Sequence, residues 1–152
     1  MDASDIKILK LLQKNARITA SEIGREISLS IPAVSERLKK LEGSGIIQQY
    51  TAVLNPRLLK RELTALMLIG LAAPKFNDRF LEFVAKEDQI LECHYIAGDF
   101  DYILKIMTES TGRLGELLNN IKGICGVQRT KTIVAISTVK NNFSLTLHDE
   151  EL

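Results

Sequence analysis

The stretch TASEIGREISLSIPAVSERLKKLEGSG, residues 19–45, contains the start signals of two helices with a short break between them. Thr19 and Glu22 form a capping box, in which each side chain can accept a hydrogen bond from a backbone N–H at the helix start. After the break SLS, Ser30 is expected to cap the next helix, Pro32 fits its first turn, and the glycines of the closing GSG end it. The sequence therefore predicts a short helix followed closely by a longer one.

A further helix is expected before this pair, over residues 5–12, because Ile and Leu residues recur there with helical spacing. Asp2 or Ser4 can cap its start. Three short helices with a tight break before the third are typical of a helix-turn-helix. Residues 46–56, IIQQYTAVLNP, then change to a two-residue period rich in β-branched and aromatic residues, which predicts one or two strands in the position of a wing.

The second half of the chain repeats a strand–helix–strand pattern twice. Such a repeat fits a four-stranded antiparallel sheet with two helices on one side, the ferredoxin-like arrangement of an α+β domain. The expected strands cover residues 62–72, 90–98, 100–108 and 126–138, and the expected helices cover residues 78–87 and 112–121. The domain boundary is expected at the basic connector RLLKRE, so that one domain covers residues 1–61 and the other covers residues 62–152.

The expected strands carry apolar residues on both faces, whereas two helices cover only one face of a sheet. We therefore expect a second copy of the chain to cover the remaining apolar surface. The residues that supply this surface are Leu66, Leu68, Ile69, Leu104, Ile106, Val134 and Ile136.

Composition narrows the class of protein. With 152 residues, of which 45% are apolar, the chain suits one domain or two small ones with packed cores. Residues 1–61 contain 11 Lys/Arg and 6 Asp/Glu, a net charge of +5, and the remaining residues have a net charge of −4. A basic first half favours a module that binds a polyanion. The sequence shows no signal-peptide pattern and no apolar run of about 20 residues, which predicts a soluble, cytoplasmic protein without a membrane partner.

The third predicted helix is expected to enter the major groove of DNA, because base edges are read from the first turns of such a helix. Ser35 and Arg37 can donate to bases or phosphates, and the lysines can neutralise phosphates. Glu36 is expected either to pair with Lys40 or to accept from a cytosine amine. The alternative is that these residues form only the solvated face of an amphipathic helix. The predicted DNA-binding residues are Pro32, Ala33, Ser35, Glu36, Arg37, Lys39 and Lys40.

Patterns for metal binding and catalysis are weak. The metal-ligand types Cys93, His94, Asp99, Asp101, Cys125 and His148 follow no zinc spacing. The two cysteines lie far apart, which favours free thiols over a disulfide. A hydrolase needs a nucleophile activated by a positioned base, and no Gly-x-Ser-x-Gly, Walker or dinucleotide motif occurs. We therefore expect neither a metal site nor an enzyme.

Three segments together resemble the Lrp/AsnC (feast/famine) family of transcriptional regulators, and most of all leucine-responsive regulatory proteins. They are LSIPAVSERLKKLEGSGIIQQYTAVLNP at 29–56, ILECHYIAGDFDYILKI at 90–106 and GVQRTKTIVAISTVK at 126–140. The resemblance implies a winged helix-turn-helix joined to an ACT-like, ligand-sensing domain that also forms oligomers. It further implies a regulator without enzymatic activity or cofactor, which binds double-stranded DNA and responds to leucine or another amino acid. Family members form homodimers, and we expect this chain to assemble further into an octamer. The exposed segment PAVSE differs from close relatives, so the operator sequence does not follow from the resemblance.

The motif GDFD, residues 98–101, opens a strand that is otherwise apolar. Gly98 and Asp99 fit a two-residue hairpin turn, which explains Asp99 structurally. Burial of Asp101 would be costly without a cation or several N–H donors, and the ammonium group of an amino acid is one such cation. In the family that the chain resembles, this loop contributes to an effector pocket between neighbouring sensing domains. The resemblance therefore implies an effector site of Gly98, Asp99, Asp101, Thr130, Thr132 and Val134, the last three sharing one strand face.

Two other classes of function stay open from the sequence. One is an amino-acid-binding sensor with little or no DNA affinity, and the other is a small enzyme with a regulatory domain. The basic helix-turn-helix and the predicted sensing domain occur in one chain, which favours an effector-responsive, DNA-binding regulator.

Overall fold

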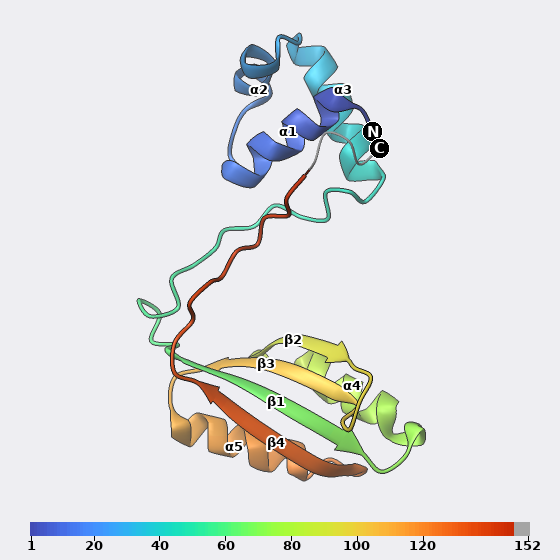
Figure 1. Cartoon of the computed structure of the whole chain (residues 1–152), viewed down its shortest axis with the longest axis vertical. Coiled ribbons are helices and arrows are strands. Elements are labelled where there is room, and N and C mark those ends of the chain that lie inside the picture. The colour runs from blue at the N-terminus through green and yellow to red at the C-terminus, as the bar shows by residue number, and fades with distance from the viewer. Residues whose placement is uncertain (148–152) are drawn as a thin grey trace. The chain divides into compact units, whose positions relative to one another are not determined.

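The computed structural model describes residues 1–147, which form two compact units (Figure 1). The first unit consists of Met1–Val53 together with residues 141–147, and the second consists of Leu54–Lys140. The sequence places the boundary at residue 61 and assigns all later residues to the second domain. The structure instead groups residues 141–147 with the first unit, through contacts described below.

The first unit is a bundle of three helices. They are α1 (Ala3–Lys14), α2 (Ala20–Ile27) and α3 (Ile31–Gly43). Asp2 caps α1, Thr19 and Glu22 form the capping box of α2, and Ser30 caps α3, so each helix starts at a cap that the sequence predicts. The three helices close around a buried apolar core of Ile8, Leu9, Ile23, Val34 and Leu41.

The tight turn between α2 and α3 depends on Gly24. The backbone N–H of Leu29 donates to Gly24 O over 2.9 Å, and Ser28 between them adopts a left-handed φ of 58°. A Cβ atom at position 24 would lie 2.6 Å from the carbonyl oxygen of Leu29, which is closer than real Cβ atoms approach. Only glycine therefore permits the close approach on which the helix-turn-helix geometry rests.

Residues 141–147 attach to α1 through a pair of hydrogen bonds. Gln13 Nε2 donates to Leu145 O over 3.1 Å, and Leu145 N donates to Gln13 Oε1 over 2.6 Å. Leu147 packs against the apolar core of the helices. The first unit is therefore assembled from two separate pieces of the chain, for which the sequence offers no periodic signal.

The strands expected over residues 46–56 do not form, and this part of the sequence-based expectation is corrected. Residues 46–62 contain no helix or strand, and Val53 and Leu54 are each 66% exposed. A strand is stabilised by a ladder of hydrogen bonds to a neighbour, and no described segment pairs with these residues. Tyr50 instead donates its hydroxyl to Glu42 Oε1 over 2.9 Å, which holds this extended segment against the end of α3.

The second unit is a four-stranded antiparallel sheet with the strand order β2-β3-β1-β4, and two helices cover one of its faces (Figure 1). Its elements are β1 (Leu63–Leu71), the short 3₁₀ helix η1 (Pro74–Phe76), α4 (Asn77–Lys86), β2 (Ile90–Tyr95), β3 (Tyr102–Thr108), α5 (Thr111–Lys122) and β4 (Val127–Ala135). Each strand is a few residues shorter than predicted. The order and type of the four strands and two α-helices agree with the predicted ferredoxin-like α+β arrangement, which is confirmed, and η1 is the one short element of this unit that the sequence does not predict.

The face of the sheet under α4 and α5 holds the core. Ile69, Leu104 and Ile106 are fully buried there, against Phe80 of α4 and Leu117 of α5. From the sequence, these three strand residues are predicted to be covered by a second copy of the chain. Two helices are enough to cover them, so that part of the expectation is wrong.

The opposite face, here called the outer face, has no covering element among the described residues. Leu66 and Leu68 point to it, since they alternate with the buried residues of β1. Leu66 pairs in register with Ile133 of β4, and both side chains are more than a third exposed. Val134 pairs with the buried Ala65 and lies on the helix-covered face instead. Ile136 lies beyond the end of β4 and is fully exposed.

Candidate functional site

The residues predicted to contact DNA lie along α3. Pro32, Glu36, Lys39 and Lys40 are exposed, and Ala33, Ser35 and Arg37 are partly buried. Within residues 1–147, neither Lys39 nor Lys40 has a hydrogen bond or ion pair to another side chain. The expected pair between Glu36 and Lys40 is also not formed, as an exposed pair gains little over solvation. The two ammonium groups are thus available to an external anion.

Arg37 has partners inside its own unit. Its Nη1 donates to Asp5 Oδ1 over 2.8 Å and to Asp2 Oδ2 over 2.7 Å, at the start of α1. The Asp5 side chain is only 6% exposed, so Arg37 neutralises a nearly buried carboxylate. The hydrogen bonds to Asp5 and then Asp2 raise the pKa of Arg37. This arrangement joins α3 to α1, a role that the sequence does not predict.

The loop with the motif GDFD is longer than the predicted two-residue turn. Tyr95 pairs with Tyr102, so residues 96–101 form a six-residue connection. Ile96 N donates to Asp101 O over 2.8 Å and closes this loop. Gly98 has a φ of +147°, which agrees with its expected role of allowing a backbone conformation that side chains disfavour. Asp99 lies in the exposed part of the loop rather than in a tight turn.

Asp101 extends the pairing between β1 and β3 past the end of β3. Its backbone N–H donates to Ile69 O over 2.9 Å, and its Oδ2 accepts from the backbone N–H of Leu71 over 2.6 Å. The C=O of Ile69 and the N–H of Leu71 point to the same side of β1, because the two residues are two positions apart on one strand. Asp101 therefore satisfies both groups, the first with its backbone N–H and the second with its carboxylate. The sequence predicts that a cation or several N–H donors stabilise Asp101, and the structure supplies one such donor, the backbone N–H of Leu71. The carboxylate retains a second oxygen without a partner in the described chain.

Arg129 of β4 reaches the same loop and does not belong to the predicted site. Its Nη2 donates to the backbone oxygen of Asp99, and its guanidinium lies 5.0 Å from the ring centroid of Phe100. Its side chain crosses Gly70, where a Cβ atom would lie 3.3 Å from Arg129 Nε. The predicted effector residues of β4 are Thr130, Thr132 and Val134, and Arg129 points to the opposite face of the strand.

The three predicted effector residues of β4 share one face, as their two-residue spacing predicts. Thr130 pairs with Ile69, Thr132 with Met67, and Val134 with Ala65, all on the helix-covered face. Asp101 approaches β1 from the β3 side, whereas these three residues flank β1 from the β4 side. Within one chain the structure therefore does not bring the two halves of the predicted effector site together.

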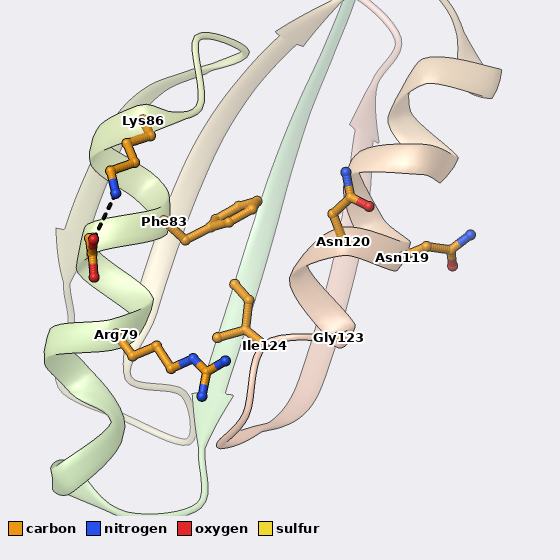
Figure 2. Close-up of a pocket in the computed structure, with 8 residues that line it drawn as sticks. Arg79, Phe83, Lys86, Asn119, Asn120, Gly123 and Ile124 are labelled. Atoms are coloured by element: carbon orange, nitrogen blue, oxygen red, sulfur yellow. Dashed lines mark hydrogen bonds and ion pairs between the residues drawn. The ribbon is translucent and has the colours of Figure 1, made fainter.

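A separate pocket of about 530 Å³ lies between α4 and α5 (Figure 2). Phe83 and Ile124 form its apolar part, and the Arg79 side chain extends toward Ile124. On its rim, Lys86 Nζ donates to Glu82 Oε1 over 2.6 Å. The pocket contains none of the residues that the sequence assigns to a site.

The remaining chemical groups form no further centre among residues 1–147. His94 lies 3.2 Å from Glu92, and burial raises the pKa of the Cys93 thiol. No group of three or more described metal-ligand residues comes together, and His148 lies outside the described residues. Of the described helices, none has both the length and the apolar character to span a bilayer.

Comparison with known proteins agrees with both units. Residues 1–48 match a family described as winged helix-turn-helix DNA-binding, and residues 64–145 match the Lrp/AsnC ligand binding domain. HTH-type transcriptional regulator FL11 of Pyrococcus abyssi is 34% identical, with 95% of each chain covered. Leucine-responsive regulatory protein of Haemophilus influenzae is 38% identical over 97% of this chain and 90% of its own length. Transcriptional regulator NMB0573 of Neisseria meningitidis, solved as a complex with L-Met, is 30% identical with a TM-score of 0.91 and 96% of each chain covered.

These relatives are transcriptional regulators rather than enzymes, and the matched regions together cover a DNA-binding module and a ligand-binding module. The fold, the capped helix-turn-helix and the antiparallel sheet agree with both matches. The chain therefore belongs to the Lrp/AsnC family and is a DNA-binding transcriptional regulator.

Proposed function

We propose that the chain binds operator DNA through the exposed face of α3, and that a free amino acid bound beside residues 96–101 changes this binding. The observation that carries the proposal is the combination, in one chain, of unpaired lysines on α3 with an acidic loop on a ligand-binding domain. The relatives named for a response to leucine, and the one crystallised with L-Met, support an amino-acid effector. The protein would act in the cytoplasm, where DNA is accessible, and without a cofactor.

The DNA contacts that we propose divide by chemistry. Lys39 and Lys40 neutralise phosphates, which supplies affinity without sequence preference. Ser35 donates to a base edge, and Glu36 accepts from a cytosine amine, since it has no lysine partner. Pro32 and Ala33 at the start of α3 contribute apolar contact to the groove. Arg37 supports this surface by holding α3 against α1 and does not itself read bases.

For the effector we propose that Asp101 binds the ammonium group through the oxygen that Leu71 does not use. Asp99 adds a second negative charge nearby, and Gly98 provides the loop conformation. Charged hydrogen bonds of this kind contribute roughly 1.5 to 3 kcal/mol each, so a single carboxylate can dominate the recognition of a small zwitterion. Neither leucine nor methionine is favoured over the other by these contacts.

We further propose that the complete effector site is formed by two copies of the chain. Thr130, Thr132 and Val134 lie on the far side of β1 from Asp101, so they would reach the ligand from a neighbouring copy. The outer face, with Leu66 and Ile133 exposed beside each other, supplies an apolar surface for a homodimer. Association of such dimers into a larger ring, with an octamer as the expected size, would then place acidic loops and β4 strands of different copies together.

The alternative is an amino-acid sensor with little DNA affinity. Fluorescence anisotropy with labelled DNA from the region upstream of the chain's own gene, with and without each of the twenty amino acids, separates the two. Replacing Lys39 and Lys40 together by Ala should weaken binding to all sequences and reduce the slope of log K against log salt by about 2. Lys122→Ala in α5 is the matched control and should leave binding unchanged.

The outcomes are distinct. Salt-sensitive DNA binding that shifts on addition of one amino acid supports the proposal. Amino-acid binding by calorimetry without DNA binding at low salt would favour the sensor instead. DNA binding that none of the twenty amino acids alters would contradict the proposed effector response.

A further inference from the structure

The charges around the GDFD loop include one cation. Arg129 reaches over Gly70 to the loop, and Asp101 is bonded to Leu71, the next residue of β1. Gly70 and Arg129 pair in register and share the outer face of the sheet. Asp101 stands directly before Tyr102, which pairs with Ile69, so it too lies beside Gly70. A carboxylate and a guanidinium therefore flank the same glycine.

The guanidinium of Arg129 is held in place but largely unused. In the described chain it makes one hydrogen bond, from Nη2 to the backbone oxygen of Asp99, and it stacks near the ring of Phe100. A guanidinium has five N–H donors in a planar fork that matches the two oxygens of a carboxylate. The cation–π contact with Phe100 restricts the guanidinium, which reduces the entropy lost when a ligand binds.

The opposite charges match the two ends of a free amino acid. A zwitterion has an ammonium group and a carboxylate on the same carbon, so it needs an anion and a cation on either side of a small space. The absent side chain of Gly70 lets Arg129 cross the strand here, since a Cβ atom at position 70 would lie 3.3 Å from Arg129 Nε. A carboxylate bound to Arg129 would pair two opposite charges and could accept from both arms of the guanidinium, whereas the bond to Asp99 O joins the guanidinium to an uncharged carbonyl.

We propose that Arg129 recognises the α-carboxylate of the amino-acid effector, with Asp101 on the ammonium group. This inference rests on the proposed effector function and deepens it, because it predicts that only ligands with a free carboxylate bind tightly. Arg129 then exchanges the backbone oxygen of Asp99 for the ligand, which links occupancy of the site to the conformation of residues 96–101.

The test compares an amino acid with its amide. The full chain is titrated calorimetrically at pH 6.5, where both ligands carry an ammonium group, with L-leucine and L-leucinamide and with L-methionine and L-methioninamide. Wild type should bind the acid at least about tenfold more tightly than the amide, which corresponds to about 1.4 kcal/mol. Arg129→Gln should lower the affinity for the acid to that for the amide and leave the amide unchanged. Arg129→Lys should keep part of the preference, because it retains the charge but not the fork.

Arg113→Gln is the matched control, since this arginine lies on α5 and pairs with Glu116. It should keep the full preference for the acid. If Arg129→Gln weakens acid and amide equally, or if wild type does not distinguish them, Arg129 does not bind the carboxylate and the inference is overturned. If circular dichroism shows that Arg129→Gln does not fold, the ratio of the affinity for the acid to that for the amide is measured in Arg129→Lys instead. A ratio equal to that of wild type would show that the guanidinium fork does not bind the carboxylate. If none of the twenty amino acids binds wild type, the proposed effector function itself fails, and this inference fails with it.

Discussion

The guanidinium of Arg37 lies 2.8 Å from the carboxylate of Asp5, which is almost fully buried at the start of α1. An arginine on the helix that we propose to contact DNA thus has its recorded partners at the start of another helix of the same unit. The pair links α3 to α1, and both of its hydrogen bonds use Nη1 of Arg37.

Arg37→Ala should therefore change folding more than it changes DNA recognition. Loss of the guanidinium leaves the Asp5 carboxylate nearly buried and unpaired, which lowers the melting temperature. The salt dependence of DNA binding should keep its wild-type slope, whereas Lys40→Ala should reduce the slope by about 1. Anisotropy titrations over a salt series measure both variants. A reduced slope for Arg37→Ala would return this residue to the DNA-contacting set.

The pH dependence of the first unit should report the carboxylate of Asp2. Its pKa is lowered from 3.8, first by the hydrogen bond from the Asp5 backbone N–H and then by Arg37. A pKa lower in the folded than in the unfolded state contributes stability that is present above pH 3.8 and is lost as the pH falls through the folded-state value. Asp2→Asn should therefore lower the melting temperature at pH 6 and have a smaller effect at pH 2.5. An equal effect at both pH values would contradict the assignment.

Gly24→Ala should destabilise the helix-turn-helix by about 1 to 3 kcal/mol, because the added methyl group meets Leu29 O. Gly43→Ala is the control on α3, where a Cβ atom meets nothing within 4 Å. That change should be neutral or stabilising by up to about 1 kcal/mol, since alanine favours a helix. Urea unfolding followed by circular dichroism and by amide signals of α1–α3 compares the two. Equal stability of both variants would show that the turn adjusts without cost.

Asp101→Asn and Asp101→Ala should separate folding from effector binding. Asn keeps an oxygen that can accept from Leu71 N–H, so its stability should stay near wild type, whereas Ala should lose about 1 kcal/mol. Both variants should bind the amino acid about ten- to a hundredfold more weakly, because the charge is gone. Thermal melting and calorimetry measure the two effects. Wild-type affinity in Asp101→Asn would exclude a contact with the ammonium group.

Ile133→Glu tests the outer face as a contact between copies. The new carboxylate lies beside Leu66 and would meet apolar surface or its own counterpart in a dimer. Light scattering on the full chain should show a smaller assembly than wild type at micromolar concentration. Leu81→Glu, at an exposed position of α4 on the helix side of the sheet, is the control and should leave the size unchanged. An assembly of unchanged size in Ile133→Glu would show that the copies associate through another surface.

Most of the fold is predictable because local signals agree with each other. Capping residues at Asp2, Thr19 and Ser30 mark the starts of the first three helices, and the repeated strand–helix–strand pattern of apolar residues in the second half indicates the type and order of its elements. The strand prediction for residues 46–56 is wrong because an alternating pattern indicates an extended backbone but does not show whether a neighbouring strand is present. Pairing is a long-range property, and the residues concerned find no described partner.

The candidate site is less predictable because its partners lie far apart in sequence. A helical projection places Arg37 beside the exposed face but says nothing of Asp5, which is 32 residues away. The partner of Asp101 is a backbone N–H, a group that every residue except proline has, so no residue type marks it. Arg129 becomes visible only through the register of β4 on β1, which brings it across Gly70.

The insertion of residues 54–140 between the two pieces of the first unit has a consequence for synthesis. The ribosome releases α1–α3 first, but the segment that pairs with Gln13 and adds Leu147 to their core emerges only after the whole sheet. The DNA-binding unit therefore reaches its final packing only on a chain that already contains its ligand-binding unit. A nascent chain that stops before residue 141 would contain every strand of the sheet, but its helical bundle would lack the contacts of Leu145 and Leu147.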